Sequence, residues 1–344
     1  MTHRSFMRAG LIVALTLAVQ IASTQIQFAQ QAAPQAAPAA PQAGRGGGQR
    51  GGVDPRVQQR TYTFADTNEQ MPYALFVSSK VTKDKKNPLI VSLHGLGGDQ
   101  NTMVRESLRS VELAEQGGYI LVAPMGYNSS GWYGIPPGAP RGGGANAAGA
   151  PQRGAGNGAA APTGGAQPGP GNGAPAAAGA RRGAGGGRGA TAGGTAITDA
   201  AKVREASEKD VMAVLDMIRK EFNVDERRIY LMGHSMGGAG TYYLGSKYAN
   251  VWAALAPIAP AAMGMTNDRA KVLQAIKDGG VPMLVSMGDA DEAVPVANVR
   301  TWVDTMKELQ MNYEYKEYPG LSHGPIMAGS MSDIYAFFAK HSKR

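Results

Sequence analysis

Short apolar runs alternate with longer amphipathic stretches along much of this chain. The runs at 88–93 and 119–123 are apolar almost throughout, as is typical of parallel strands that are buried on both faces of a sheet. In the stretch 198–221, apolar residues recur at helical spacing behind a Thr-Asp pair suited to capping a helix. Strands that alternate with helices predict an α/β fold with a mostly parallel, doubly wound sheet.

The element boundaries follow from the same periodicity and from the glycines and prolines that interrupt it. We predict strands at 60–64, 73–77, 88–93, 119–123, 228–232, 282–287 and 313–318. We predict helices at about 102–115, 198–221, 268–277, 296–309 and 326–339, and one more that begins directly after residue 235.

Two segments lack the large apolar residues that a folded core requires. Residues 30–55 are mainly Gln, Ala, Pro and Gly, and residues 136–196 are nearly all Gly, Ala and Pro with five arginines and no acid. Such segments cannot offset the entropy lost on ordering, so both are predicted to be disordered. We therefore expect a disordered linker at 30–58 and a single folded domain at 59–344, which a disordered insertion interrupts at 136–197.

The first 29 residues have the form of a secretory signal peptide. Arg4 and Arg8 precede an apolar run at 10–22, which is too short to span a bilayer. We therefore expect an exported protein, periplasmic or extracellular, with no stable membrane insertion after the signal is removed.

Charge and cysteine content exclude several classes of function. The formal net charge is +8, but the signal and the two low-complexity tracts contribute +9, so the folded part carries about −1. A nearly neutral domain gives no basis for nucleic-acid binding. The chain has no cysteine, which excludes disulfides and thiolate metal sites, and it has no phosphate-binding Gly-x-x-x-x-Gly-Lys motif. We expect neither a cofactor nor a metal.

The segment Gly233-His-Ser-Met-Gly237 carries the clearest chemical signal. It follows a predicted strand and precedes a predicted helix, which is the context of a nucleophile elbow. In such a turn the residues two positions either side of the serine must be small, so that its hydroxyl stands clear of the backbone. A chain with 48 glycines also forms this pattern by chance, as an ordinary turn with a buried serine, so Ser235 needs catalytic partners.

A serine nucleophile requires a base, and elimination among five histidines favours His323. It lies in a loop after the last predicted strand, where an imidazole can reach back over the sheet edge. The others lie in the signal, in the C-terminal tail, inside the elbow and on a loop before the nucleophile (His3, His341, His234 and His94). The alternative is that His323 is a surface or structural histidine.

The acid that orients the base is expected between Ser235 and His323 in the chain. The segment 287–295 offers three candidates, Asp289, Asp291 and Glu292. We favour Asp291 because it lies farther into the loop, whereas Asp289 is placed to brace the loop and Glu292 to face solvent.

The oxyanion of an acyl-transfer intermediate requires two preorganised N–H donors. The backbone N–H of Met236 follows the nucleophile, and Leu96 in the glycine-rich loop 94–98 is the best second candidate. An ordinary glycine turn is the alternative for that loop. Trp132 and Tyr133 are expected to line the acyl or alcohol pocket, although aromatic residues near a loop as often serve local packing.

These motifs resemble the α/β-hydrolase superfamily, on the segments 93–98, 224–238, 288–295 and 318–323. The chain looks most like the small carboxylesterase branch, which includes feruloyl and polyhydroxybutyrate esterases and proteins similar to acyl-protein thioesterases and dienelactone hydrolases. Catalytic domains of prolyl-oligopeptidase type are also similar. The resemblance implies that Asp291 is the catalytic acid and that Asp225 braces the turn before the elbow strand. The insertion at 136–197 departs from the family, at a place where relatives often carry substrate-binding loops.

We therefore expect a serine esterase that cleaves small-molecule or polymeric carboxylic esters through an acyl-enzyme. A serine peptidase of prolyl-oligopeptidase type would use the same residues, although no gating domain precedes the catalytic one. A non-catalytic protein that binds carbohydrate or polymer on the same fold is the other alternative. The sequence predicts no particular acyl group, alcohol or oligomeric state.

Overall fold

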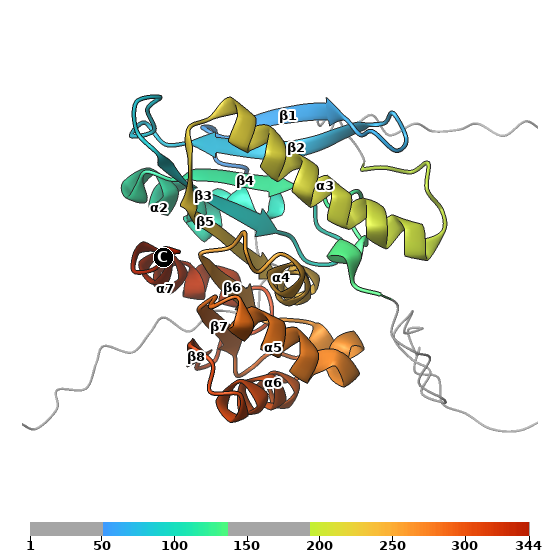
Figure 1. Ribbon diagram of the computed structural model, residues 1–344, viewed down its shortest axis with the longest axis vertical. Helices are drawn as coiled ribbons and strands as arrows, with labels where there is room; N and C mark the ends of the chain where they lie inside the picture. The colour runs from blue at the N-terminus through green and yellow to red at the C-terminus, as the bar shows by residue number, and fades with distance from the viewer. Residues whose placement is uncertain (1–50, 137–192, 344) are drawn as a thin grey trace, which may run out of the picture. The chain divides into compact units, whose positions relative to one another are not determined.

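The computed structural model describes residues 51–136 and 193–343 (Figure 1). The predicted signal peptide and most of the predicted linker and insertion lie outside these residues. The ends of both tracts are described and pack on the domain: Val53 pairs with Arg105, and Gly194 N donates to Tyr127 O over 2.6 Å. The folded domain thus includes a few residues that the sequence assigned to disorder.

An eight-stranded sheet forms the centre of the domain, in the order β1-β2-β4-β3-β5-β6-β7-β8. The strands are β1 (Gln58–Thr63), β2 (Gln70–Val77), β3 (Asn87–Leu93), β4 (Ile120–Pro124), β5 (Val224–His234), β6 (Ala254–Ile258), β7 (Met283–Gly288) and β8 (Tyr313–Tyr318). Only β2 runs antiparallel to its neighbours, β1 and β4, and the remaining pairs are parallel. The mostly parallel α/β fold predicted from the sequence is confirmed.

Helices cover both faces of the sheet (Figure 1). They are α2 (Ser110–Gly117), α3 (Ala200–Glu221), α4 (Met236–Lys247), α5 (Arg269–Asp278), α6 (Val296–Glu308) and α7 (Ile326–Ala339). Helices α2 and α7 contact each other on one face, while α3, α4 and α5 pack on the other. Every residue of β3 is buried, as expected for a strand covered on both sides. None of the helices in the described part of the chain is long and apolar enough to cross a bilayer.

The helix ends explain why the predicted start of α3 is confirmed and the predicted start of α2 is wrong. Asp199 caps α3 as predicted, since its side chain accepts hydrogen bonds from Ala201 N and Lys202 N. The predicted helix at 102–115 is wrong in its first half, which forms two 3₁₀ turns, Thr102–Val104 and Glu106–Leu108. Arg109 then takes a left-handed conformation with φ of 58°, so continuous helix begins only at residue 110.

The strand order changes direction at β3. From β3 the chain moves to β4 on one side and then to β5 on the other. In open α/β sheets the carboxyl ends of the strands at such a switch point form the ligand site. The loops after β3 and β5 are the two that carry the predicted oxyanion donor and the predicted nucleophile.

Candidate active site

The turn between β5 and α4 holds Ser235 in a conformation that residues with side chains rarely adopt. Its φ is 57° and its ψ is −113°, and strain of this kind costs about 1–3 kcal/mol. The turn requires glycine on both sides of the serine. A Cβ on Gly233 would lie 2.3 Å from the Gly237 oxygen, and a Cβ on Gly237 would lie 2.4 Å from the Leu93 oxygen. The strand, turn and helix predicted around Ser235 are therefore present.

Neighbouring strand ends hold this turn from both sides. After β6, Ile258 O accepts from Ser235 N over 2.9 Å and Ala261 N donates to Ser235 O over 3.0 Å. After β3, a Cβ on Gly95 would lie 3.2 Å from the Ser235 Cβ, so the absence of a side chain there permits close approach. Ser235 thus lies between the loops that follow β3 and β6.

An aspartate and a histidine from two further loops meet beside this turn. Asp291 follows β7 and His323 follows β8, and Asp291 Oδ2 lies 2.7 Å from His323 Nδ1. The Asp291 side chain is fully buried, and its Oδ1 accepts from Ala293 N and Val294 N over 2.9 and 2.8 Å. Because a carboxylate only accepts, His323 Nδ1 donates, and in the neutral imidazole Nε2 therefore carries the lone pair. The arrangement leaves Nε2 able to accept a proton.

The two other acids of this loop serve different purposes. Asp289 is exposed and its Oδ1 accepts from Gly320 N over 2.6 Å, which braces the loop that leads to His323. Glu292 is exposed to solvent. The structure therefore brings Asp291, and neither competitor, to the imidazole.

His323 packs against the elbow by contacting His234, the residue before Ser235. The rings of His234 and His323 have centroids 4.5 Å apart. Within the described part of the chain, Ser235 Oγ makes no hydrogen bond, and in unliganded enzymes such bonds are often long until substrate binds. The structure brings Ser235, His323 and Asp291 to one end of the sheet, while their catalytic roles stay predictions.

The backbone N–H groups of Leu96 and Met236, the two predicted oxyanion donors, have no acceptor among the described residues. Gly97 N donates to Ser129 O over 2.8 Å and Gly98 N to Gly95 O over 3.0 Å, which fixes the loop that carries Leu96. The Leu96 side chain itself is 63% exposed. Both donors can therefore serve a ligand, as the prediction requires.

The two predicted pocket aromatics lie in different environments. Tyr133 is completely buried, and its hydroxyl donates to His94 O over 3.0 Å. Trp132 is half-buried and lines a hollow of about 170 Å³. The other lining residues are Ile135, Pro136, Arg204, Ala239, Ala261, Met263, Gly264 and Met265. Since Ala261 is bonded to the Ser235 carbonyl, this hollow borders the elbow.

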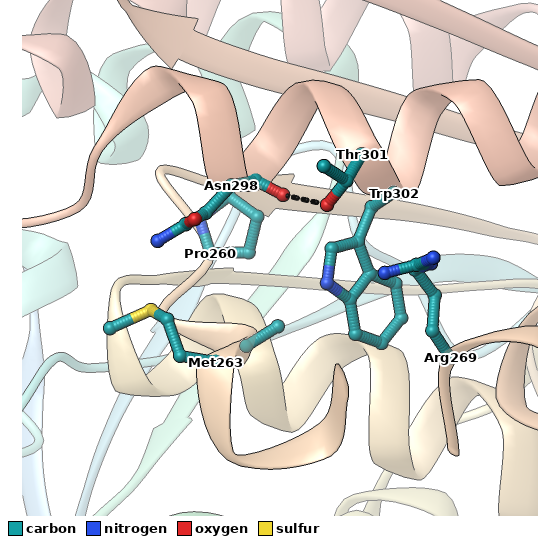
Figure 2. A pocket seen from close by; sticks show the side chains of 7 residues that line it. Pro260, Met263, Arg269, Asn298, Thr301 and Trp302 are labelled. Atoms are coloured by element: carbon teal, nitrogen blue, oxygen red, sulfur yellow. Dashed lines mark hydrogen bonds between the residues drawn. The ribbon is translucent and has the colours of Figure 1, made fainter. Parts of the chain in front are cut away.

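A second hollow, also of about 170 Å³, is lined in part by the segment after β6 (Figure 2). It is lined by Pro260, Ala262, Met263, Arg269, Asn298, Thr301 and Trp302. Figure 2 shows the Thr301 hydroxyl bonded to the Asn298 carbonyl over 2.7 Å. Arg269 Nε donates to Thr305 Oγ1 over 2.8 Å. Met263 lines both hollows, so it stands between them.

Sequence reasoning missed the polar residues that hold these loops in place. Asp210 on α3 is fully buried and accepts from Gly126 N, Tyr127 N and the Tyr62 hydroxyl over 2.6, 3.2 and 2.5 Å. Burial raises the pKa of Asp210 to about 6. Its bonds fix the loop after β4 that carries Trp132. The amphipathic pattern of α3 gave no signal for a buried acid.

His94, on the loop before the nucleophile, has a comparable structural task. It is buried, and its Nε2 lies 2.7 Å from Met125 O, which joins the loops after β3 and β4.

Among the described residues no group of three or more His, Asp or Glu side chains could hold a metal ion.

A mostly parallel eight-stranded sheet, a serine in a strained turn after β5, and an aspartate and a histidine after β7 and β8 define an α/β hydrolase. The chain belongs to the dienelactone hydrolase family, whose sequence model matches residues 76–336. The resemblance inferred from the motifs and the prediction of a hydrolytic enzyme are thereby confirmed.

Solved structures similar to this chain share its fold. A ferulic acid esterase has a TM-score of 0.56 at 14% identity, over 83% of this chain and 98% of its own. An S-formylglutathione hydrolase from Agrobacterium tumefaciens has a TM-score of 0.55 at 13% identity, over 86% of this chain and 97% of its own. A thermostable esterase has a TM-score of 0.53 at 22% identity, and the match covers 84% of this chain but only 64% of the esterase.

One curated relative is similar over a short segment. The bifunctional acetylxylan esterase/xylanase XynS20E of Neocallimastix patriciarum is 49% identical over 47 residues. This segment is 14% of the present chain and 7% of that much longer protein.

Proposed function

We propose that this protein is a serine esterase that hydrolyses carboxylic esters through an acyl-enzyme intermediate. The observation that carries the proposal is the Asp291–His323 pair, 2.7 Å apart, beside the strained turn that presents Ser235. A buried carboxylate that holds an imidazole in one tautomer beside a serine is the arrangement that activates a hydroxyl nucleophile.

The proposed reaction has two steps. Ser235 Oγ attacks the ester carbonyl while His323 Nε2 takes its proton, and Asp291 stabilises the imidazolium that forms. The N–H groups of Leu96 and Met236 donate to the oxyanion. Collapse of the intermediate expels the alcohol, which receives the proton from His323. Water, deprotonated by the same nitrogen, then attacks the acyl-enzyme. Collapse of this second intermediate expels Ser235 Oγ, which takes the proton back from His323, and the acid is released.

The proposed substrates are esters with a short or aromatic acyl group. The hollow beside Trp132 borders the elbow and is mostly apolar, with a volume of about 170 Å³, and Leu96 and Met263 add exposed apolar surface at 63% and 36%. Tyr133 is buried, so we assign pocket lining to Trp132 and packing to Tyr133. Because similar proteins carry the names acetylxylan esterase and ferulic acid esterase, acetyl and feruloyl esters of polysaccharides are the first candidates.

The test compares the intact protein with its Ser235→Ala variant on nitrophenyl acetate, methyl ferulate and acetylated xylan. We expect kcat to fall by about 10⁶-fold, as in other serine hydrolases that lose the nucleophile. Ser246→Ala, on the same helix α4, is the matched control, since among the described residues its hydroxyl bonds only to Tyr243 O, and it should leave kcat unchanged.

The rival functions give different results in the same experiment. Faster cleavage of peptide amides than of esters would favour a peptidase. Absence of both ester hydrolysis and Ser235 labelling by a fluorophosphonate would favour a non-catalytic binding protein. Undiminished hydrolysis by the Ser235→Ala variant would refute the proposal.

We also propose that the protein is exported, on the basis of Arg4, Arg8 and the apolar run at 10–22. N-terminal sequencing of the protein from its source cells should place the first residue of the mature chain beyond residue 22. An intact N-terminus on protein from the cytoplasm would contradict export.

A further inference from the structure

His234, the residue before the proposed nucleophile, lies between the elbow and two neighbouring loops, those after β3 and β8. Its Nε2 lies 2.7 Å from the main-chain oxygen of His323, and the two rings pack at 4.5 Å with an angle of 48°. Its Nδ1 would lie 3.2 Å from a Cβ on Gly95, in the loop of the proposed oxyanion donor. The side chain thus fills the space between the loops after β3, β5 and β8.

The direction of the hydrogen bond follows from the protonation of the ring. Burial, and secondly the neighbouring His323, lower the pKa of His234 to about 4. The ring is therefore neutral near pH 7, and since a carbonyl oxygen only accepts, the proton lies on Nε2. His234 donates to the main chain of His323.

His323 is consequently held at two points. Asp291 fixes its side chain through Nδ1 over 2.7 Å, and His234 fixes its backbone. A side-chain bond alone sets the rotation of an imidazole but not the position of the loop that carries it. The backbone bond links that loop directly to the turn that presents Ser235.

We propose that His234 is a positioning residue, which holds the base His323 at the correct distance from Ser235. The inference rests on the proposed function, because it assigns His323 as the base. Since a displacement of about 1 Å at a reacting group can cost about 100-fold in rate, loss of this contact should lower kcat strongly. KM should change little, because His234 is 6% exposed and lines neither hollow beside the segment after β6.

Two substitutions distinguish the effect of losing the hydrogen bond from the effect of losing the volume of the ring. The amide nitrogen of His234→Gln can reach roughly where Nε2 lies, whereas His234→Leu fills space without a donor. We expect His234→Leu to lower kcat for nitrophenyl acetate by about 10–100-fold with KM within about twofold, and His234→Gln to recover about tenfold of that loss. The concentration of active sites is measured by prolonged labelling with a fluorophosphonate, and kcat is calculated per labelled site. Unfolded protein therefore does not lower kcat.

His341→Leu is the matched control for the general effect of losing such an imidazole. His341 Nδ1 also bonds a main-chain oxygen, that of Phe337, over 2.8 Å, and its ring packs on Phe337 at 4.3 Å. It lies in the C-terminal tail outside the proposed site, so its loss should lower Tm as His234→Leu does while leaving kcat unchanged.

Each outcome bears on one proposal. If the intact protein hydrolyses esters and His234→Leu keeps full kcat, the positioning role is refuted and the proposed function stands. Equal losses in His234→Leu and His234→Gln, or a rise in KM in place of a fall in kcat, would also overturn it. If the intact protein hydrolyses no ester and no fluorophosphonate reacts with Ser235, the proposed function itself fails.

Discussion

Replacing Asp291 by asparagine should place the proton of His323 on the wrong nitrogen. Asp291 Oδ1 accepts from the backbone N–H groups of Ala293 and Val294 over 2.9 and 2.8 Å, while Oδ2 faces His323 Nδ1 at 2.7 Å. In the Asp291→Asn variant the amide oxygen must face the two backbone donors. The amide NH₂ therefore faces Nδ1, which has to accept. The proton moves to Nε2, which can no longer take a proton from Ser235.

The size of the effect follows from the same contacts. Turning the amide around would restore the tautomer but lose two backbone hydrogen bonds, at about 1 kcal/mol each. It would also place the amide NH₂ against the N–H groups of Ala293 and Val294. The wrong tautomer therefore predominates. The corresponding substitution in a serine protease triad lowers kcat about 10⁴-fold, which at about 1.4 kcal/mol per tenfold corresponds to about 5.5 kcal/mol of lost transition-state stabilisation. Because the variant is neutral and nearly isosteric, we expect only a small change in Tm.

The assay measures kcat and KM for nitrophenyl acetate in the intact protein and in Asp291→Asn. The control is Asp289→Asn, whose amide oxygen can still accept from Gly320 N, and kcat should fall less than about threefold. A kcat above about one tenth of the intact protein's value in Asp291→Asn would refute the reasoning. An equal loss in Asp289→Asn would show that the acid has been assigned to the wrong residue.

Three further predictions concern strain, buried charge and the pocket. Because Ser235 has φ of 57° and ψ of −113°, the free energy of unfolding of Ser235→Gly, measured by urea denaturation, should exceed that of Ser235→Ala by about 1–2 kcal/mol. The reverse order would show that the turn is not strained. Because burial raises the pKa of Asp210 to about 6, its contribution to stability is present below pH 4 and is lost as pH rises through 6. The free energy of unfolding of the intact protein should thus fall by about 3 kcal/mol relative to Asp210→Asn between pH 4 and 7, and a constant difference would contradict the shift. Trp132→Ala should raise KM for methyl ferulate about tenfold with little effect on nitrophenyl acetate, whereas equal effects on both esters would exclude an aromatic acyl subsite beside Trp132.

Strands and most helices could be predicted because they depend on local apolar spacing. β3 is buried along its whole length and reads as an apolar run, and Asp199 marks the start of α3 as a capping residue should. The 3₁₀ turns before α2 could not be predicted, because the left-handed Arg109 that separates them from the helix is a conformation a non-glycine residue adopts only when tertiary contacts impose it.

The members of the candidate site could be named from the sequence, but their contacts could not. Glycine spacing indicates Ser235 because the turn excludes side chains at both flanking positions. The contact between His234 and His323 joins residues 89 positions apart, and no local pattern reports it. The sequence therefore indicated that His234 is constrained within the elbow, but not that it bonds to the loop of the base.

Helix α3 shows where reasoning from polarity fails and why that matters for function. Ser207 and Asp210 are polar, yet both are completely buried. They bond to backbone N–H groups of the loop after β4, in which Tyr127, Trp132 and Tyr133 all have positive φ. Such conformations cost free energy, and the hydrogen bonds that these N–H groups donate to buried acceptors offset that cost. The loop holds Trp132 beside the hollow at the elbow, so the residues that break the polarity pattern are those that shape the proposed pocket.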